Sequence, residues 1–265
     1  MSDYVLVLSD VEVTRYERMA EHAHQEEAAQ WATVGIAEGA RVADVGCGPG
    51  AMSTLVARLV GADGAVWAVD QDAQAVSTAE AMAAKRGLDN VHCHVGDADA
   101  TGLDAGSFDV VMMRHVLAHN GGHEQAIVDH AASLLKPGGC LYLVDIDGPA
   151  MRSRPAGADM TDLSARYWDF QTARGNDMAV GLRLGELVTG AGLELVEHRG
   201  WYDIFAAPPG LRTPAWAARH AMVAAGHATE ADLDRWGAYF ERFDKGEVEL
   251  TLFVALFSAI GRRRR

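Results

Sequence analysis

Residues 42–50 read VADVGCGPG, and this stretch decides the fold. It opens with a short apolar segment, expected to be a strand over residues 41–45. Three glycines follow at alternate positions, Gly46, Gly48 and Gly50, and helical spacing of apolar residues then runs over 51–60. A strand, a bare glycine turn and a helix in this order are typical of an open α/β sheet, in which ligands bind at the carboxyl ends of the strands. We therefore expect a ligand site at this turn.

The segments after this turn alternate between expected strands and expected helices of about 10 to 15 residues. Strands are expected at 41–45, 65–70, 90–98, 108–119 (running into a loop or short helix) and 140–147, and helices at 15–32, 51–60, 73–86 and 123–135, with a further helix ended by Gly39. This alternation is the pattern of βαβ units, so the sequence predicts an α/β fold with a parallel sheet.

The pattern changes after Gly148, where prolines, glycines and the aromatic group RYWDF appear. Further along, a helix is expected over 183–192, a strand over 193–201, helices within 208–245 and a last strand over 248–260. We expect four parts: an N-terminal helical cap (1–40), a ligand-binding α/β core (41–148), a helical insertion or lid (149–182), and completion of the core (183–265) with a helical lid insertion at about 205–245.

Composition and charge exclude several classes of protein. The chain has 265 residues and a net charge of -14, whereas a nucleic-acid binder usually presents a basic face. No apolar run reaches the roughly 18 residues of a membrane span, and no basic region precedes the short apolar VLVL near the start. We expect a cytoplasmic protein with a small-molecule partner, without nucleic acid or membrane. Three scattered cysteines, none in a CxxC pair, argue against a disulfide framework or a metal site.

Three acidic residues at strand ends narrow the class of ligand. Asp44 precedes the glycine turn, where a pyrophosphate would meet a like charge but an ammonium group would be stabilised. Asp70 ends the second strand, and a carboxylate there can accept both hydroxyls of a ribose. Asp97 follows the third strand, where it can accept from an adenine amino group. An adenosyl ligand with a cationic amino-acid tail fits all three, and that ligand is S-adenosylmethionine (SAM).

The same segments carry a resemblance to a known family. In order, they are VADVGCGPG (42–50), AVDQD (68–72), GDAD (96–99), FDVVMMRHVLAH (108–119) and LLKPGGCLYLVD (134–145). Together they resemble class I SAM-dependent methyltransferases of the ubiquinone/menaquinone-methyltransferase-like group, over roughly residues 30–148. The resemblance implies a Rossmann-like, seven-stranded, mostly parallel sheet with an antiparallel last strand, plus a helical lid. It also implies a SAM-dependent methyltransferase acting on a small molecule in natural product biosynthesis.

The resemblance also implies roles for individual residues. The glycine loop, with Gly46, Cys47, Gly48 and Gly50, should hold the methionine part of SAM above Asp44, and Asp70 should hold the ribose. The remaining expected cofactor contacts are Gln71 beside the adenine or ribose, Asp97 and Ala98 at the adenine edge, Arg114 and His115 on the floor between SAM and acceptor, and Tyr16 and His24 from the N-terminal helix.

Methyl transfer asks mainly for alignment and exclusion of water, and it needs a general base only when the acceptor must lose a proton. His115 and His119, four residues apart, are candidates for such a base or for orienting the acceptor, and the alternative is that they hydrogen-bond in the pocket wall. Tyr167, Trp168 and Phe170 are candidates for an apolar acceptor wall, and the alternative is lid core.

Other interpretations stay open at this point. The chain could bind SAM without transferring its methyl group, for example for a cyclisation, because the cofactor motifs would look the same. GCGPGA also fits the loose dinucleotide pattern G-x-G-x-x-A, which leaves an NAD(P)-dependent oxidoreductase as a second alternative. No Asn/Asp-Pro-Pro-Tyr/Phe motif follows the fourth strand, which disfavours methylation of DNA adenine or of glutamine. The acceptor, the methylated atom (O, C or N) and the oligomeric state, with a homodimer among the options, are not fixed.

Overall fold

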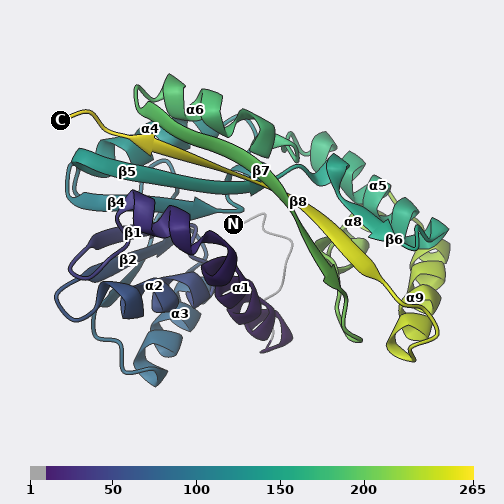
Figure 1. Ribbon diagram of the computed structural model, residues 1–265. Coiled ribbons are helices and arrows are strands. Elements are labelled where there is room, and N and C mark those ends of the chain that lie inside the picture. Colours follow the sequence, from purple (N-terminus) through teal and green to yellow (C-terminus); the bar gives the residue numbers. More distant parts are fainter. Residues whose placement is uncertain (1–9) are drawn as a thin grey trace.

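The computed structural model describes the chain from Asp10 to Arg265, with side chains described from Tyr16 onwards. The first nine residues of the expected N-terminal cap lie outside the described part. An α/β sheet forms one part of the molecule, and a group of helices stands beside it at the far end of two long strands (Figure 1). None of the described helices combines the length and apolarity that crossing a membrane requires.

The sheet has eight strands in the order β3-β2-β1-β4-β5-β8-β6, with β7 on the other edge of β8. Strands β1 to β5 are parallel, while β8 runs antiparallel to β5, β6 and β7. Their bounds are β1 Arg41–Val45, β2 Ala65–Asp70, β3 Val91–Val95, β4 Phe108–Arg114, β5 Leu135–Ile146, β6 Arg152–Arg154, β7 Glu194–Ala206 and β8 Thr251–Arg262. The expected mostly parallel α/β sheet is confirmed.

The sequence-based strand count was one too low, because β6 was not expected. Strand β8 pairs with β5 only as far as Leu256 opposite Ile146, and it continues past the end of β5. Residues 152–154 take up the same edge of β8 beyond that point. The sheet edge would otherwise expose unpaired backbone groups, and three residues suffice to cover it.

Helices cover both faces of the sheet (Figure 1). Helices α1, α2 and α3 share one face, where Trp31, Val56 and Tyr142 belong to one buried cluster. Helices α4 and α6 cover the other face, over a cluster that includes Met113, Ile127 and Leu141. The helices are α1 Asp10–Val34, α2 Ala51–Val60, α3 Ala73–Lys85, α4 Glu124–Leu134, α5 Ala158–Ala173, α6 Leu184–Gly190, α7 Pro214–Ala217, α8 Arg219–Ala224 and α9 Glu230–Asp244, with short 3-10 turns η1 Leu117–His119, η2 Gly148–Ala150 and η3 Val180–Arg183.

The lid consists of β6, the far ends of β7 and β8, and helices α5, α7, α8 and α9. Both segments that the sequence marked as helical insertions contribute to it, and they pack against each other through contacts of α5 with α7, α8 and α9. Met160, Met222, Trp236 and Phe240 are buried there. The lid is therefore built from two segments far apart in the sequence.

Several boundaries differ from the expected ones, and two of these differences involve the packing of the core. Helix α1 ends at Val34 and residues 35–39 form turns, so no second helix ends at Gly39. Strand β5 starts at Leu135 instead of residue 140, and its first residues pair with β4 across an irregularity between Phe108 and Val110. Residues 136–139, KPGG, were expected to lie between helix 123–135 and strand 140–147, but the irregularity accommodates them in β5.

A buried ion pair fastens α1 to the sheet. Glu27, 1% exposed, accepts hydrogen bonds from Arg114 Nη1 at 2.5 and 2.8 Å and from the hydroxyl of Tyr142 at 2.7 Å. Arg114 ends β4, and Tyr142 lies on the neighbouring strand β5. A single carboxylate therefore joins the helix to two strands at the edge where the parallel strands end.

We expect Glu27→Ala to lower the free energy of unfolding by about 3–5 kcal/mol, because it leaves the largely buried Arg114 without its counter-charge. Urea unfolding followed by tryptophan fluorescence measures the loss. Glu17→Ala is the matched control on the same helix: Glu17 pairs with Arg86 at 2.7 Å but is 41% exposed, so its loss should stay below about 1 kcal/mol. Equal losses in the two variants would contradict an anchoring role for Glu27.

Candidate active site

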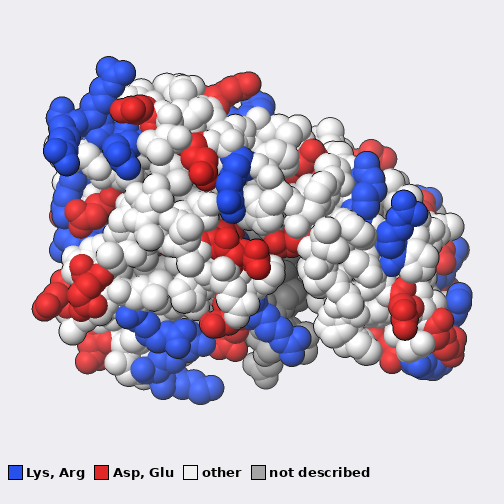
Figure 2. All heavy atoms as spheres, viewed as in Figure 1, with Lys and Arg blue, Asp and Glu red and all other residues white. Residues whose placement is uncertain are grey.

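A cavity of about 1670 Å³ lies between the carboxyl ends of the parallel strands, helix α1 and the lid. Figure 2 shows that the surface is hollowed between the two parts of the molecule. The cavity lies where open α/β sheets bind their ligands. It brings together the ends of β1, β2 and β4, the turn after β3, the start of α1 and the inner wall of the lid.

The glycine loop after β1 is held against the end of β2. The N–H groups of Gly46 and Cys47 both donate to Val69 O, at 2.8 and 3.0 Å. Gly46 has φ 74°, and a Cβ there would lie 2.3 Å from a methyl carbon of Val116. Glycine is therefore required both by the backbone conformation and by the close approach of the loop that follows β4.

Asp44 lies beneath this loop and is 3% exposed. It accepts a hydrogen bond of 2.6 Å from the hydroxyl of Ser53 on α2. Burial raises the pKa of Asp44 to about 6, although the Ser53 hydrogen bond and the charge of Arg114 oppose the shift. A carboxylate in this position stabilises a positive charge brought into the cavity, because burial has removed much of its hydration.

Asp70, at the end of β2, fixes the loop from the other side. Its two carboxylate oxygens accept the N–H groups of Gly48 at 2.9 Å and Asp72 at 3.0 Å. Burial raises the pKa of Asp70 despite these two hydrogen bonds. Asp70 lines the cavity together with its neighbour Gln71. The carboxylate thus has ordered geometry and further lone pairs available to a ligand.

The floor of the cavity turns sharply after β4. His115 has φ 56°, the left-handed region that side chains other than glycine seldom adopt, and its N–H donates to Val144 O at 2.9 Å. Such conformations concentrate at functional sites. Arg114 beside it is committed to Glu27, whose charge raises the pKa of Arg114 although burial opposes this shift. Arg114 lines the cavity as one half of an ion pair.

Asp145 supports this floor from β5 and was not singled out in the sequence. It is 1% exposed, and it accepts the backbone N–H of Ala118 at 3.2 Å and of Ile146 at 2.9 Å. Burial raises the pKa of Asp145 to about 7. Its position at the carboxyl end of a parallel strand is the signal that could have found it. Glu27 gave no such signal, because its partners are 87 and 115 residues away.

His119 lines the same floor, and burial together with the charge of Arg174 lowers its pKa to about 4. It is therefore neutral at physiological pH. A base whose conjugate acid has a pKa of about 4 abstracts protons poorly near neutral pH, where catalysis favours a pKa close to the working pH. The lowered pKa is less suited to a general base than to the hydrogen-bonding role that was the alternative for His119.

Most of the other expected residues also line the cavity. From the expected set, the lining includes Tyr16, Cys47, Asp97, Ala98, Tyr167 and Trp168. Burial raises the pKa of the Cys47 thiol, so this side chain adds no charge to the lining.

Three expected contacts lie elsewhere. The ring of His24 stacks on Trp31, with centroids 5.4 Å apart. Phe170 is buried in the lid against His227. Gly50 precedes α2 and lies against Ala79 of α3. In the structure these three residues take part in packing. The sequence pattern alone does not distinguish a residue that packs in the core from one that contacts a ligand.

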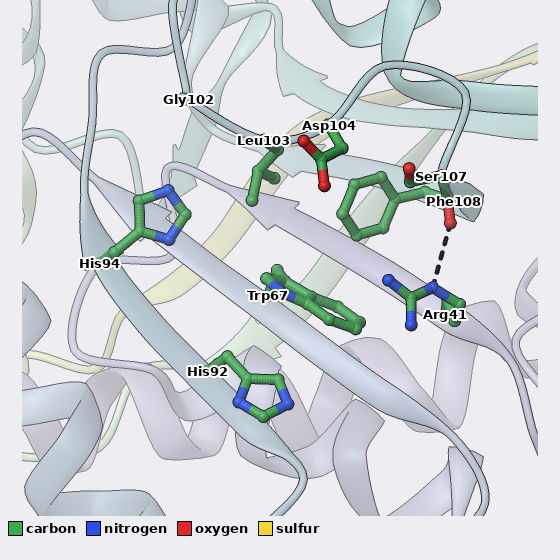
Figure 3. Close-up of a pocket in the computed structure, with 9 residues that line it drawn as sticks. All are labelled: Arg41, Trp67, His92, His94, Gly102, Leu103, Asp104, Ser107 and Phe108. Atoms are coloured by element: carbon green, nitrogen blue, oxygen red, sulfur yellow. Dashed lines mark hydrogen bonds between the residues drawn. The ribbon is translucent and has the colours of Figure 1, made fainter.

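A second, smaller hollow of about 450 Å³ lies at the opposite end of the strands (Figure 3). Arg41 reaches over the ring of Trp67, 4.2 Å from its centroid, and donates to Ser107 O at 3.1 Å. His92 and His94 share this face of β3, as their alternation predicts. The hollow exists because the connection from β3 to β4 contains no helix. It is partly filled by Arg41 and lies away from the glycine loop.

The fold and the carboxyl-edge site together define a class I SAM-dependent methyltransferase. Residues 36–195 match the family described as Methyltransferase domain, and the chain belongs to this family. Its cofactor is S-adenosylmethionine, and the glycine loop with the buried Asp44 and Asp70 suits that cofactor.

Relatives of known name agree with this assignment. The chain is 35% identical over 118 residues to an arsenite methyltransferase of Aquipseudomonas alcaligenes, covering 42% of this chain and 34% of that protein. It is 33% identical over 166 residues to a ubiquinone biosynthesis O-methyltransferase of Xanthomonas axonopodis pv. citri, covering 61% of this chain and 66% of that one. The matches thus span between a third and just under two thirds of these relatives. The crystal structure of BH2331 from Bacillus halodurans has a similar fold, with a TM-score of 0.61, 19% identity and coverage of 91% of this chain and 100% of that one.

We expect Gly46→Ala to destabilise the protein by roughly 2–4 kcal/mol, because its Cβ would meet both an unfavourable φ and the stiff side chain of Val116. Gly39→Ala is the matched control, since Gly39 has φ 80° but nothing within 4 Å of an added Cβ. It should cost only about 1–2 kcal/mol. Thermal and urea unfolding of both variants measure the difference, and no difference would show that the approach of Val116 does not constrain the loop.

Proposed function

We propose that this protein transfers the methyl group of SAM to an oxygen, carbon or nitrogen atom of a small-molecule acceptor, a secondary metabolite. One observation carries the proposal: the glycine loop and the carboxylates of Asp44, Asp70 and Asp97 line one end of a cavity that continues under a lid. Bound SAM supplies a methyl group already activated by its sulfonium. The protein's own contribution is to bind, to align and to exclude water.

The cofactor contacts follow the chemistry of these groups. Asp44 and the loop at Gly46, Cys47 and Gly48 hold the amino-acid end, where the buried carboxylate answers an ammonium charge. Asp70 accepts from the ribose hydroxyls, and it is already aligned by its hydrogen bond from Gly48. Asp97 and Ala98 border the adenine. Tyr16 covers the loop from α1, since its ring is the nearest group to a Cβ added at Gly48, at 3.9 Å.

The acceptor lies on the lid side of His115. The left-handed backbone conformation of His115 turns the chain after β4, and this turn lies between the cofactor end and the lid end of the cavity. Tyr167 and Trp168, on α5, form part of the acceptor wall. His115 orients the acceptor or accepts its proton, and His119 contributes a neutral hydrogen-bonding group. The lid closes the site against water, as a reactive sulfonium requires.

Calorimetric titration with SAM, S-adenosylhomocysteine and NADH tests the cofactor assignment. We expect both adenosyl ligands to bind and NADH not to bind. Asp70→Asn should weaken S-adenosylhomocysteine by about 10-fold to 100-fold, because charge-assisted hydrogen bonds contribute roughly 1.5–3 kcal/mol. Asp89→Asn, an exposed residue outside the cavity, should bind like the parent.

Mass detection then tests the transfer itself. The protein is incubated with SAM and a mixed set of phenolic, enolic and amine acceptors, and the expected products are S-adenosylhomocysteine and an acceptor heavier by one methylene. NADH binding without adenosyl binding would overturn the proposal in favour of an oxidoreductase. An acceptor converted without formation of S-adenosylhomocysteine would replace methyl transfer by another SAM-supported reaction.

The placement of the ammonium beside Asp44 predicts a pH effect. Burial raises the pKa of Asp44 to about 6, and a neighbouring ammonium stabilises the carboxylate and lowers that pKa. Binding of S-adenosylhomocysteine at pH 6 should therefore release a fraction of a proton from Asp44, whereas at pH 8 this carboxylate is already ionised and releases none. Affinity should correspondingly rise with pH up to about 6 and then level off.

Calorimetry at pH 6 in two buffers of different ionisation enthalpy measures the proton release. Asp44→Asn is the control, because it removes the titrating group and leaves Asp145, whose pKa is about 7, in place. Identical proton release in the parent and in Asp44→Asn would show that the ammonium does not lie against Asp44.

A further inference from the structure

The charged residues that line the large cavity are unevenly divided between two parts of the chain, the first up to Asp145 and the second from Pro149 onwards, which we call the cofactor half and the lid half. Among the described residues that line it, the part up to Asp145 contributes eight carboxylates and two arginines. The part from Pro149 onwards contributes three arginines, Arg152, Arg174 and Arg212, and a single carboxylate, Asp203. This basic half occurs in a chain with a net charge of -14. The division suits a cationic cofactor on one side and a ligand of opposite charge on the other.

We propose that the acceptor is an anionic amphiphile: a sizeable, mostly apolar molecule whose carboxylate binds in the lid half of the cavity, with Arg152 as its principal partner and Arg174 as a second positive charge. This inference rests on the proposed function, since it assigns the substrate class of the same cavity.

Arg152 has the geometry of an anchor. It lies on β6, the strand that extends the sheet into the lid, and its Nη1 donates to Pro149 O at 2.5 Å and Met151 O at 2.7 Å. These bonds fix the guanidinium and leave its other donors for a ligand. Within the described part of the chain, no carboxylate lies within ion-pair distance of it. By contrast Arg166 and Arg235, also in the lid, are paired with Asp162.

The other two arginines have different roles. Arg212 forms two hydrogen bonds to Asp244, at 2.5 and 3.1 Å, so its charge is compensated within the lid. Arg174, at the end of α5, lines the cavity near the floor, and its charge contributes to lowering the pKa of His119. Its positive potential therefore reaches the region between floor and lid.

The apolar body of the ligand follows from size and lining. Ligand pockets usually measure roughly 300–1000 Å³, and this cavity measures about 1670 Å³, enough for a cofactor and a second molecule of comparable size. The lid wall between the arginines is mostly apolar and includes Met151, Met160, Tyr167, Leu211, Leu252 and Phe253. A small polar acceptor would leave this surface uncovered.

Charge also orients such a ligand. Figure 2 shows both acidic and basic side chains around the hollow, whereas the cofactor half of the lining is mainly acidic. A carboxylate turned towards that half would meet like charges, which costs binding energy, whereas in the lid half it meets Arg152. The uneven distribution of charge in the cavity therefore favours an acceptor with a carboxylate and orients that carboxylate towards the lid.

The test uses anthraquinone-2-carboxylate and anthraquinone-2-carboxamide, two probes of equal size that differ in charge. Each is titrated into the full-length protein saturated with S-adenosylhomocysteine. We expect the carboxylate to bind at least about tenfold more tightly than the carboxamide. Arg152→Gln should reduce this preference to less than about threefold while leaving carboxamide affinity unchanged, and Arg152→Lys should retain most of it. Arg154→Gln, on the same strand but outside the cavity lining, should behave like the parent.

Several results would overturn the proposal while leaving the proposed function intact. These are equal affinity of the parent for the two probes, no binding of either probe, or loss of both affinities together in Arg152→Gln. Failure of the proposed function has a separate signature, because S-adenosylhomocysteine itself would then not bind in the first step of the same experiment.

Discussion

The buried carboxylate of Glu27 is the contact on which the arrangement of the site depends. It ties α1, a helix outside the sheet, to Arg114 and Tyr142 on two adjacent strands. Arg114 immediately precedes the strained turn at His115, so the anchor of the helix and the shape of the floor are set at the same place. Without this ion pair, α1 would depend on its apolar packing against α2 and the sheet and on more exposed pairs such as Glu17–Arg86, and Tyr16 would be held less firmly over the glycine loop.

Burial of carboxylates is the other constraint, and the protein meets it differently at each position. Glu27 is compensated by a full positive charge, which is the arrangement that makes a buried ion tolerable. Asp44 and Asp145 have hydrogen-bond donors but, among the described residues, no direct ion pair, and burial raises the pKa of each. Such a carboxylate has already lost most of its hydration during folding, so binding a cation costs little further desolvation. The cavity therefore contains negative charge that no residue of the fold neutralises directly among those described.

The sequence predicted the cofactor half of the molecule well, because its signals are local. Strands 41–45 and 65–70 and helix 51–60 have the expected bounds, since a glycine borders each segment at one end or both: Gly46, Gly50, Gly61 and Gly64. The roles of the acidic residues at the strand ends stay predictions, although the cavity brings them together. The rest depended on pairing between distant segments. Nothing near residues 152–154 indicates a strand, because that strand forms only where β8 outruns β5.

The long β7–β8 ribbon connects the part of the cavity near the glycine loop with the part under the lid, where we propose that the acceptor binds. Near the core β8 pairs with β5, and farther out it pairs with β6, so one continuous strand supports both halves of the cavity. The lid wall and the glycine loop come from separate segments of the chain, so substitutions in the lid are expected to alter the lid wall without contact to the glycine loop. Arg152 lies on β6, and it therefore belongs to the lid and not to the glycine loop. Under our proposal, substitution of Arg152 should alter which acceptor binds while SAM affinity is retained.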